Sequence, residues 1–167
     1  MSWFTKSRPD ATALDELAAH LGRRPRPLAW ASGLDAYVVG LAEGLAVRQK
    51  GEWDLIGWHE IESGGWQGET GELRWRLDDD TEGSVALTDP GLLPELLKER
   101  VEASIVIEQY LDVPGGRVVI AGRRALGDPE APIIWHAMPV GGASLDNLVV
   151  RQRVVDATER LRLDYEI

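Results

Sequence analysis

The strongest constraint on the fold is the stretch from residue 51 to residue 77, GEWDLIGWHEIESGGWQGETGELRWRL, which holds four of the seven tryptophans. Its end alternates, so that Leu73, Trp75 and Leu77 share one side and charged residues share the other. A period of two is typical of a strand with one buried and one solvated face. The stretch therefore predicts an antiparallel sheet with Trp75 in its core, and it does not identify a function.

Short alternating apolar runs continue on both sides, from residue 28 to residue 88. Glu43-Gly44 and Lys50-Gly51 are typical of tight turns between antiparallel strands. Gly64-Gly65 is interpreted as a break after the strand that contains Trp58. These signals predict an antiparallel meander.

Three segments have helical periodicity. A short helix is expected over residues 10–21, with Gly22 as its stop, and a central helix over LLPELLKERVEAS at 92–104. A long terminal helix is expected from about Asp146 to Leu163, with Ser144 or Asp146 as its N-cap. Strand-like segments at 105–111, 117–121 and 133–138 lie between the last two helices.

Strands in hairpin-connected groups, without regular alternation with helices, indicate an α+β fold. We expect a mostly antiparallel meander sheet of about eight strands with a central helix and a long C-terminal helix. At 167 residues the chain is expected to form a single domain. Its expected parts are an N-terminal arm and short helix (1–27), a meander plus helix (28–103), and three further strands with the terminal helix (104–167).

The formal charge of −10 argues against binding to nucleic acid or to anionic membranes, which require a positive surface. The chain has no cysteine, so disulfides and thiolate chemistry are excluded. No apolar run reaches the roughly 18 residues of a membrane span, and the N-terminus has no apolar signal region. A cytoplasmic location is therefore expected, and Trp3 and Phe4 are expected to dock the arm on the domain.

The known local motifs of catalysis are missing. His20, His59 and His136 lie far apart, without the spacing of a metal site. Neither a GxSxG elbow nor a phosphate-binding glycine loop is present. We therefore assign no catalytic residue, no metal ligand and no cofactor from the sequence, although sites assembled from distant residues leave no local motif.

Four residues are candidates for contact with a ligand or partner: Trp58, His59, Glu60 and Trp66. His59 and Glu60 belong to the one polar cluster that lies beside tryptophans, and Trp66 stands between glycines in a segment without periodicity. Packing in the core or against a loop is the favoured interpretation of Trp66. A contact role in an exposed glycine-rich loop is the alternative.

The segment LAWASGLDAYVVGLAEGLAVRQKGEWDLIGWHEIESGGW resembles the start of bacterial pleckstrin-homology-like domains. The likeness lies in short meander strands followed by Trp58 and Ile61, then by LRWRL, SVALTD and the helix LLPELLKERV, and covers about residues 28–103. That fold ends with one helix after seven strands, so the last part of this chain departs from it. The whole chain is also similar to short, uncharacterised proteins of high-GC Gram-positive bacteria that carry the string LPELLKERVEASIV, and this likeness implies no activity.

The residues favour a non-enzymatic binding or scaffold domain that acts through protein–protein contacts. The alternative is a small-molecule-binding protein or enzyme with a pocket near Trp58, His59, Glu60 and Trp66. The partner is accordingly an unknown protein or a small molecule, and a homodimer is a further alternative that the residues leave open.

Overall fold

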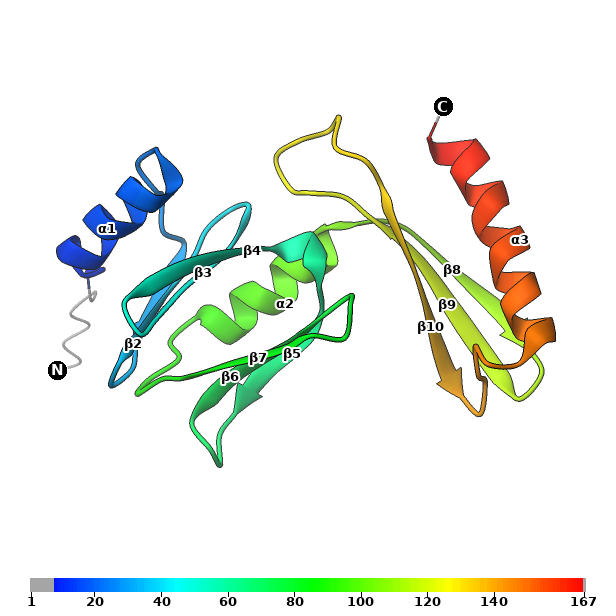
Figure 1. Cartoon of the computed structure of the whole chain (residues 1–167), viewed down its shortest axis with the longest axis horizontal. Coiled ribbons are helices and arrows are strands. Elements are labelled where there is room, and N and C mark those ends of the chain that lie inside the picture. The colour runs from blue at the N-terminus through cyan, green and yellow to red at the C-terminus, as the bar shows by residue number, and fades with distance from the viewer. Residues whose placement is uncertain (1–7, 167) are drawn as a thin grey trace, which may run out of the picture. The chain divides into compact units, whose positions relative to one another are not determined.

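The computed structural model describes residues 8–166, and the chain in it forms two compact units, Met1–Val101 and Glu102–Ile167 (Figure 1). The internal boundary expected after residue 103 falls close to the boundary between the units. The expectation that the whole chain acts as one domain stays a prediction. The expected docking of Trp3 and Phe4 lies outside the described residues.

Within residues 8–166 there are three α-helices, one short 3-10 helix and ten strands. The first unit contains α1 (Ala11–Leu21), β1 (Ala29–Ser32), β2 (Ala36–Gly40), β3 (Gly44–Gln49), β4 (Glu52–Gly57), η1 (Trp58–Glu60), β5 (Ile61–Gln67), β6 (Glu72–Leu77), β7 (Glu82–Ala86) and α2 (Leu93–Ala103), whose end crosses the boundary. The second unit contains β8 (Ile105–Val113), β9 (Gly116–Arg123), β10 (Ile134–Gly141) and α3 (Leu148–Tyr165).

The α+β class is confirmed, but the expectation of one meander of about eight strands is wrong. The described strands form three antiparallel sheets, ordered β1-β2-β3-β4, β5-β6-β7 and β10-β9-β8. Along the chain, the 3-10 turn η1 lies between the strands of the first and second sheets, and α2 lies between those of the second and third.

Strand β5 shows why the strand count was too low. The sequence predicts a break at Gly64-Gly65, yet both residues pair with β6, opposite Trp75 and Arg74. A Cβ on Gly64 would lie only 2.8 Å from the backbone oxygen of Arg74 and 3.2 Å from Leu97. Glycine is therefore used here for close packing within a strand, and it does not mark a turn.

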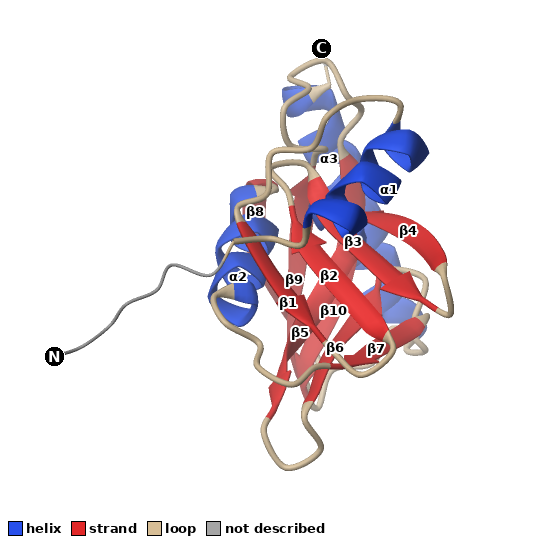
Figure 2. Cartoon of the chain, turned by 90° about the vertical axis from the view of Figure 1, so that its left-hand side faces the viewer, coloured by secondary structure: helices blue, strands red, loops and turns tan. Residues whose placement is uncertain are grey.

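The first sheet is covered on one face by α1, as Figure 2 shows. Leu17 and Ala13 of α1 are fully buried against Tyr37, Val39 and neighbouring apolar side chains of the sheet. The helix begins and ends as expected, because the Asp10 carboxylate accepts the Ala13 N–H (3.2 Å) and Gly22 adopts a left-handed conformation.

Helix α2 fastens the two sheets of the first unit to each other. Leu96 lies so close to Gly40 of β2 that a Cβ there would meet its methyl group at 2.3 Å, and Leu97 packs beside Gly64 of β5. Both leucines are buried. The Thr88 N–H donates to the Ser32 oxygen (3.0 Å), so the chain after β7 also meets β1.

In the second unit, α3 covers one face of the β10-β9-β8 sheet. Its buried stripe, Val150, Val154, Ala157 and Leu161, packs on Val113, Val118 and Ile120. The N-cap differs from the two residues expected, because the Asn147 carboxamide accepts the N–H groups of Val149 (2.9 Å) and Val150 (3.3 Å).

The Ser144 hydroxyl accepts the Asp146 N–H (3.2 Å) and so belongs to the turn before that cap. Helix α3 therefore begins later than the sequence predicted.

Candidate functional site

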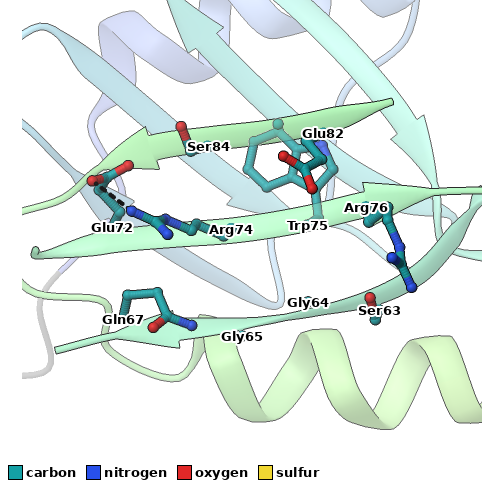
Figure 3. Close-up of a pocket in the computed structure, with 11 residues that line it drawn as sticks. Ser63, Gly64, Gly65, Gln67, Glu72, Arg74, Trp75, Arg76, Glu82 and Ser84 are labelled. Atoms are coloured by element: carbon teal, nitrogen blue, oxygen red, sulfur yellow. Dashed lines mark hydrogen bonds and ion pairs between the residues drawn. The ribbon is translucent and has the colours of Figure 1, made fainter. Parts of the chain in front are cut away.

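The exposed side of β5, β6 and β7 forms a broad polar surface with a shallow hollow of about 720 Å³ (Figure 3). We call this surface the polar sheet face. The residues of this face occupy alternate positions of the three strands: Ser63, Gly65, Gln67, Glu72, Arg74, Arg76, Glu82 and Ser84.

The alternation of β6 places these groups. Leu73 and Trp75 are buried, and Arg74 and Arg76 are exposed, as the period of two predicted. The antiparallel register then sets Arg74 between Gly65 of β5 and Ser84 of β7. Neither neighbour is charged, and the Arg74 side chain extends along β6 toward Glu72 (Figure 3).

Two ion pairs link the arginines to carboxylates of the same sheet. The shortest nitrogen–oxygen distance is 3.4 Å for Arg74–Glu72 and 3.2 Å for Arg76–Glu62. The hydrogen bond from Arg74 lowers the pKa of the Glu72 carboxyl below its ordinary value. The arginines are about half exposed, and ion pairs of this kind contribute little to stability because water screens them. A partner can therefore replace these ion pairs with its own at a small loss of free energy.

Glycines shape the inner and outer sides of this sheet differently. On the inner side Trp75 stands in a row with Gly64 and Gly83, and a Cβ on Gly83 would overlap the Trp75 ring at 2.3 Å. On the outer side a Cβ on Gly65 would meet no atom within 4 Å. The hollow is therefore open above Gly65, beside Arg74.

The sheet is also the acidic part of the chain. Residues 60–86 contain eight carboxylates and two arginines, a net charge of −6 out of −10 for the whole chain. The carboxylates lie on the face and at both ends of the sheet, where Glu69 and Asp79 occupy the turns. The local field therefore favours a cationic group over an anionic one.

Trp58, the first of the four predicted contact residues, lies in the core. Its side chain is 0% exposed, and its indole N–H donates to the Leu41 backbone oxygen (2.8 Å). It has no solvent-facing surface with which to bind a ligand in this structure.

His59 and Glu60 lie together in η1, where they serve the local turn. The Glu60 carboxylate accepts the Gly57 N–H (2.8 Å), which caps η1, and the His59 ring packs beside Gly57. The Nδ1 atom of His59 is buried and has no hydrogen-bond partner among the described residues.

Trp66 lies in β5 opposite Leu73 and is half-buried, in place of the exposed loop that the alternative interpretation required. None of the four predicted residues lines the hollow on the polar sheet face. Sequence reasoning did not select Arg74 and Arg76 as candidates, although their outward position was readable from the alternation of 72–77.

A second hollow, of about 910 Å³, lies at the edge of the first sheet, beside α1. Its lining includes Tyr37 and Arg48, which are neighbours in the register of β2 and β3. The Arg48 guanidinium lies over the rings of Tyr37 (5.8 Å) and Trp53 (5.7 Å), and it pairs with Glu16 at 2.8 Å. Because this cation already occupies the aromatic surface, the polar sheet face is the better candidate site.

Residues 8–166 contain neither a metal-binding cluster nor a membrane-spanning helix. No group of three or more His, Asp or Glu side chains in that range could hold a metal ion. No helix there combines the length and the apolarity that crossing a bilayer demands. Comparison with protein-family models, with curated proteins and with solved structures gave no match.

Proposed function

We propose that this protein is a non-enzymatic binding domain that acts through protein–protein contacts, and that its first unit is pleckstrin-homology-like. The observation that carries the proposal is the polar sheet face, a broad and open surface that presents Arg74 and Arg76. Arginine is enriched in protein interfaces. Open surfaces suit protein partners better than small molecules, which usually bind in enclosed pockets.

The order of elements supports the pleckstrin-homology-like part of the proposal. A four-stranded meander, a three-stranded meander and then one helix follow each other in the first unit. Seven strands followed by a helix is the order expected from the resemblance. The acidity of residues 60–86 does not suit an anionic phosphoinositide as its ligand.

In-cell photocrosslinking tests the proposal. A photoreactive amino acid replaces Ser84, which is exposed on the polar sheet face, or Asp15, which is exposed on α1 away from it. We expect protein adducts with the Ser84 variant and none with the Asp15 variant. Equal adducts from both positions, or none from Ser84, would contradict a protein contact at this face.

One observation favours the alternative of a small-molecule site near Trp58, His59, Glu60 and Trp66. The buried Nδ1 of His59 has no partner within residues 8–166, so a ligand could supply one. A thermal-shift screen against metabolites and metal ions tests this. A ligand whose stabilisation is lost in both His59→Ala and Trp66→Ala would replace the protein-contact proposal.

A further inference from the structure

Strand β5 is the edge of its sheet. One side of the strand pairs with β6, and among the described residues no other strand pairs with it. Ser63, Gly64 and Gln67 are exposed. The backbone groups on the outer side of Ser63–Trp66 make no hydrogen bond to any described segment. Leu97 of α2 approaches Gly64 from the inner side of the sheet, and Gly64 itself stays exposed. An exposed edge whose N–H and C=O groups are unpaired can pair with another chain.

Natural edge strands are usually protected against such pairing by charged side chains, proline, bulges or a covering helix or loop. The bulge of β5 lies at its start, between Ile61 and Ser63, and the only charged residue of the strand, Glu62, lies in it. The remaining segment, Ser63–Gln67, has a regular register and no charge or proline. Residues 63–66, whose outer backbone groups are unpaired, are therefore available, and they make a short strand.

The surroundings define what an added strand would meet. Alternate side chains of that strand would lie next to Ser63, Gly65 and Gln67, at the border of the polar sheet face. The absence of a side chain at Gly65 leaves open space at that border. Figure 3 shows Arg76 extending from β6 toward Ser63, where it pairs with Glu62.

Charge selects the kind of strand. The eight carboxylates and two arginines of residues 60–86 repel an acidic segment and attract a basic one. Glu62 lies in β5 and Glu72 lies opposite Gln67, and both carboxylates pair with arginines at the surface. A lysine or arginine of the partner can take the place of these internal donors without burying an unpaired charge.

We propose that the β5 edge binds an extended, lysine- or arginine-bearing segment of a partner protein, which adds to the β5-β6-β7 sheet as a fourth strand. This rests on the proposed function, because it names the partner chemistry and the binding mode for the same face. Backbone hydrogen bonds with β5 fix the position of the partner segment. Its alternate basic side chains lie over the polar sheet face and make the site prefer basic segments to acidic ones.

The test uses the full chain and a displayed library of random peptides. Peptides selected on the protein are synthesised, and their affinity is measured by calorimetry. The matched variants are Gly65→Lys and Gly65→Glu, because a side chain at this position meets no atom and both side chains are long. The same peptides are also made with N-methyl groups at alternate residues. Methylation removes the N–H groups on one edge of the peptide strand, so that this edge can no longer donate hydrogen bonds to β5.

We expect selected peptides rich in lysine or arginine at alternate positions. Gly65→Lys should weaken their binding by about tenfold or more, and Gly65→Glu should leave it unchanged or strengthen it. N-methylation at alternate residues should abolish binding in one of its two registers. Circular dichroism of both variants checks that the fold is retained.

Three outcomes would overturn this inference, and the first two differ in what they say about the proposed function. If Gly65→Lys weakens binding but N-methylation in both registers has no effect, the face binds peptides without strand addition, and the proposed function stands. If neither Gly65 variant changes the affinity and the Ser84 crosslinks are also absent, the proposed function fails as well. Selection of acidic peptides would contradict the charge argument directly.

Discussion

Arg48 and Glu16 join α1 to the first sheet: the Arg48 Nη1 lies 2.8 Å from the Glu16 Oε2. The same guanidinium lies over Tyr37 and Trp53, its two neighbours across the sheet. The Tyr37 hydroxyl in turn accepts the Asp10 N–H (2.8 Å), at the start of α1. The row of side chains formed by Tyr37, Arg48 and Trp53 therefore holds both the middle and the start of α1 against the first sheet.

Removal of the Arg48 cation should loosen this attachment. Arg48→Gln is expected to lower the free energy of unfolding by about 1–2 kcal/mol, because it loses two cation–π contacts and an ion pair. Glu16→Gln should cost less, about 0.5 kcal/mol, because Glu16 is about half exposed. Urea unfolding of the single and double variants measures both, and full additivity would contradict the coupling.

Trp58 should matter far more for stability than Trp66, although the sequence placed both among the contact candidates. Trp58→Phe leaves the Leu41 oxygen without its indole donor in the core and creates a small void, which should cost about 2–3 kcal/mol. Trp66→Phe, at a half-buried position, is the matched control and should cost about 1 kcal/mol or less. Equal losses in thermal unfolding would show that Trp58 is not held as described.

The contrast between these two tryptophans shows what local sequence reveals. Alternation in 72–77 correctly predicted Trp75 inside and the two arginines outside, because a strand's period is a property of neighbouring residues. The burial of Trp58 depends on Leu41, 17 positions away, and no local pattern encodes that contact. Helices α1 and α2 were predicted for the same reason, because the spacing of apolar residues along a helix is also a property of neighbouring residues.

The candidate site was less predictable than the fold. Glycine has two structural uses, the turn and the close approach, and the sequence alone does not separate them. Gly64-Gly65 was therefore interpreted as a break, which removed the edge strand β5 from the expected sheet. Without that strand, the surface between β5 and the arginines of β6 could not be inferred. The contact roles assigned to His59 and Glu60 stay predictions.

Two glycines of the second sheet should respond in opposite ways to alanine. Gly83→Ala places a Cβ 2.3 Å from the buried Trp75 ring, which must shift to make room, and should cost about 1–3 kcal/mol. Gly65→Ala meets no atom and should be neutral or should stabilise by about 0.4–1 kcal/mol, because it restricts the unfolded chain. Chemical unfolding of both variants gives the comparison, and a loss at Gly65 would contradict the open space above it.

The N-cap of α3 can be assigned by mutation. Asn147→Ala should lower the free energy of unfolding by about 1 kcal/mol, because two helix N–H groups lose their acceptor. Asp146→Ala, one residue earlier, is the control and should cost less, since its carboxylate only approaches Arg151 at 4.0 Å on the surface. The reverse order in thermal unfolding would restore the cap that the sequence predicted.

The lowered pKa of Glu72 should depend on Arg74, which supplies the main hydrogen bond to its carboxylate. A carboxyl whose folded pKa lies below its unfolded value contributes stability above the unfolded pKa and loses that contribution as the pH falls through the folded pKa. Arg74→Gln should therefore raise the pKa of Glu72 toward its ordinary value, as measured by NMR titration of the side-chain carboxyl carbon. Arg76→Gln, whose partner is Glu62, should leave Glu72 unchanged.

The same titration reports on the partner. A basic peptide bound along β5 should keep the pKa of Glu72 low even in Arg74→Gln, because its own cation replaces the lost guanidinium. If the peptide binds and the pKa of Glu72 in this variant still rises to its ordinary value, the cation does not lie over the polar sheet face. The carboxyl of Glu72 is thus a direct reporter of which donor, internal or external, occupies the hollow.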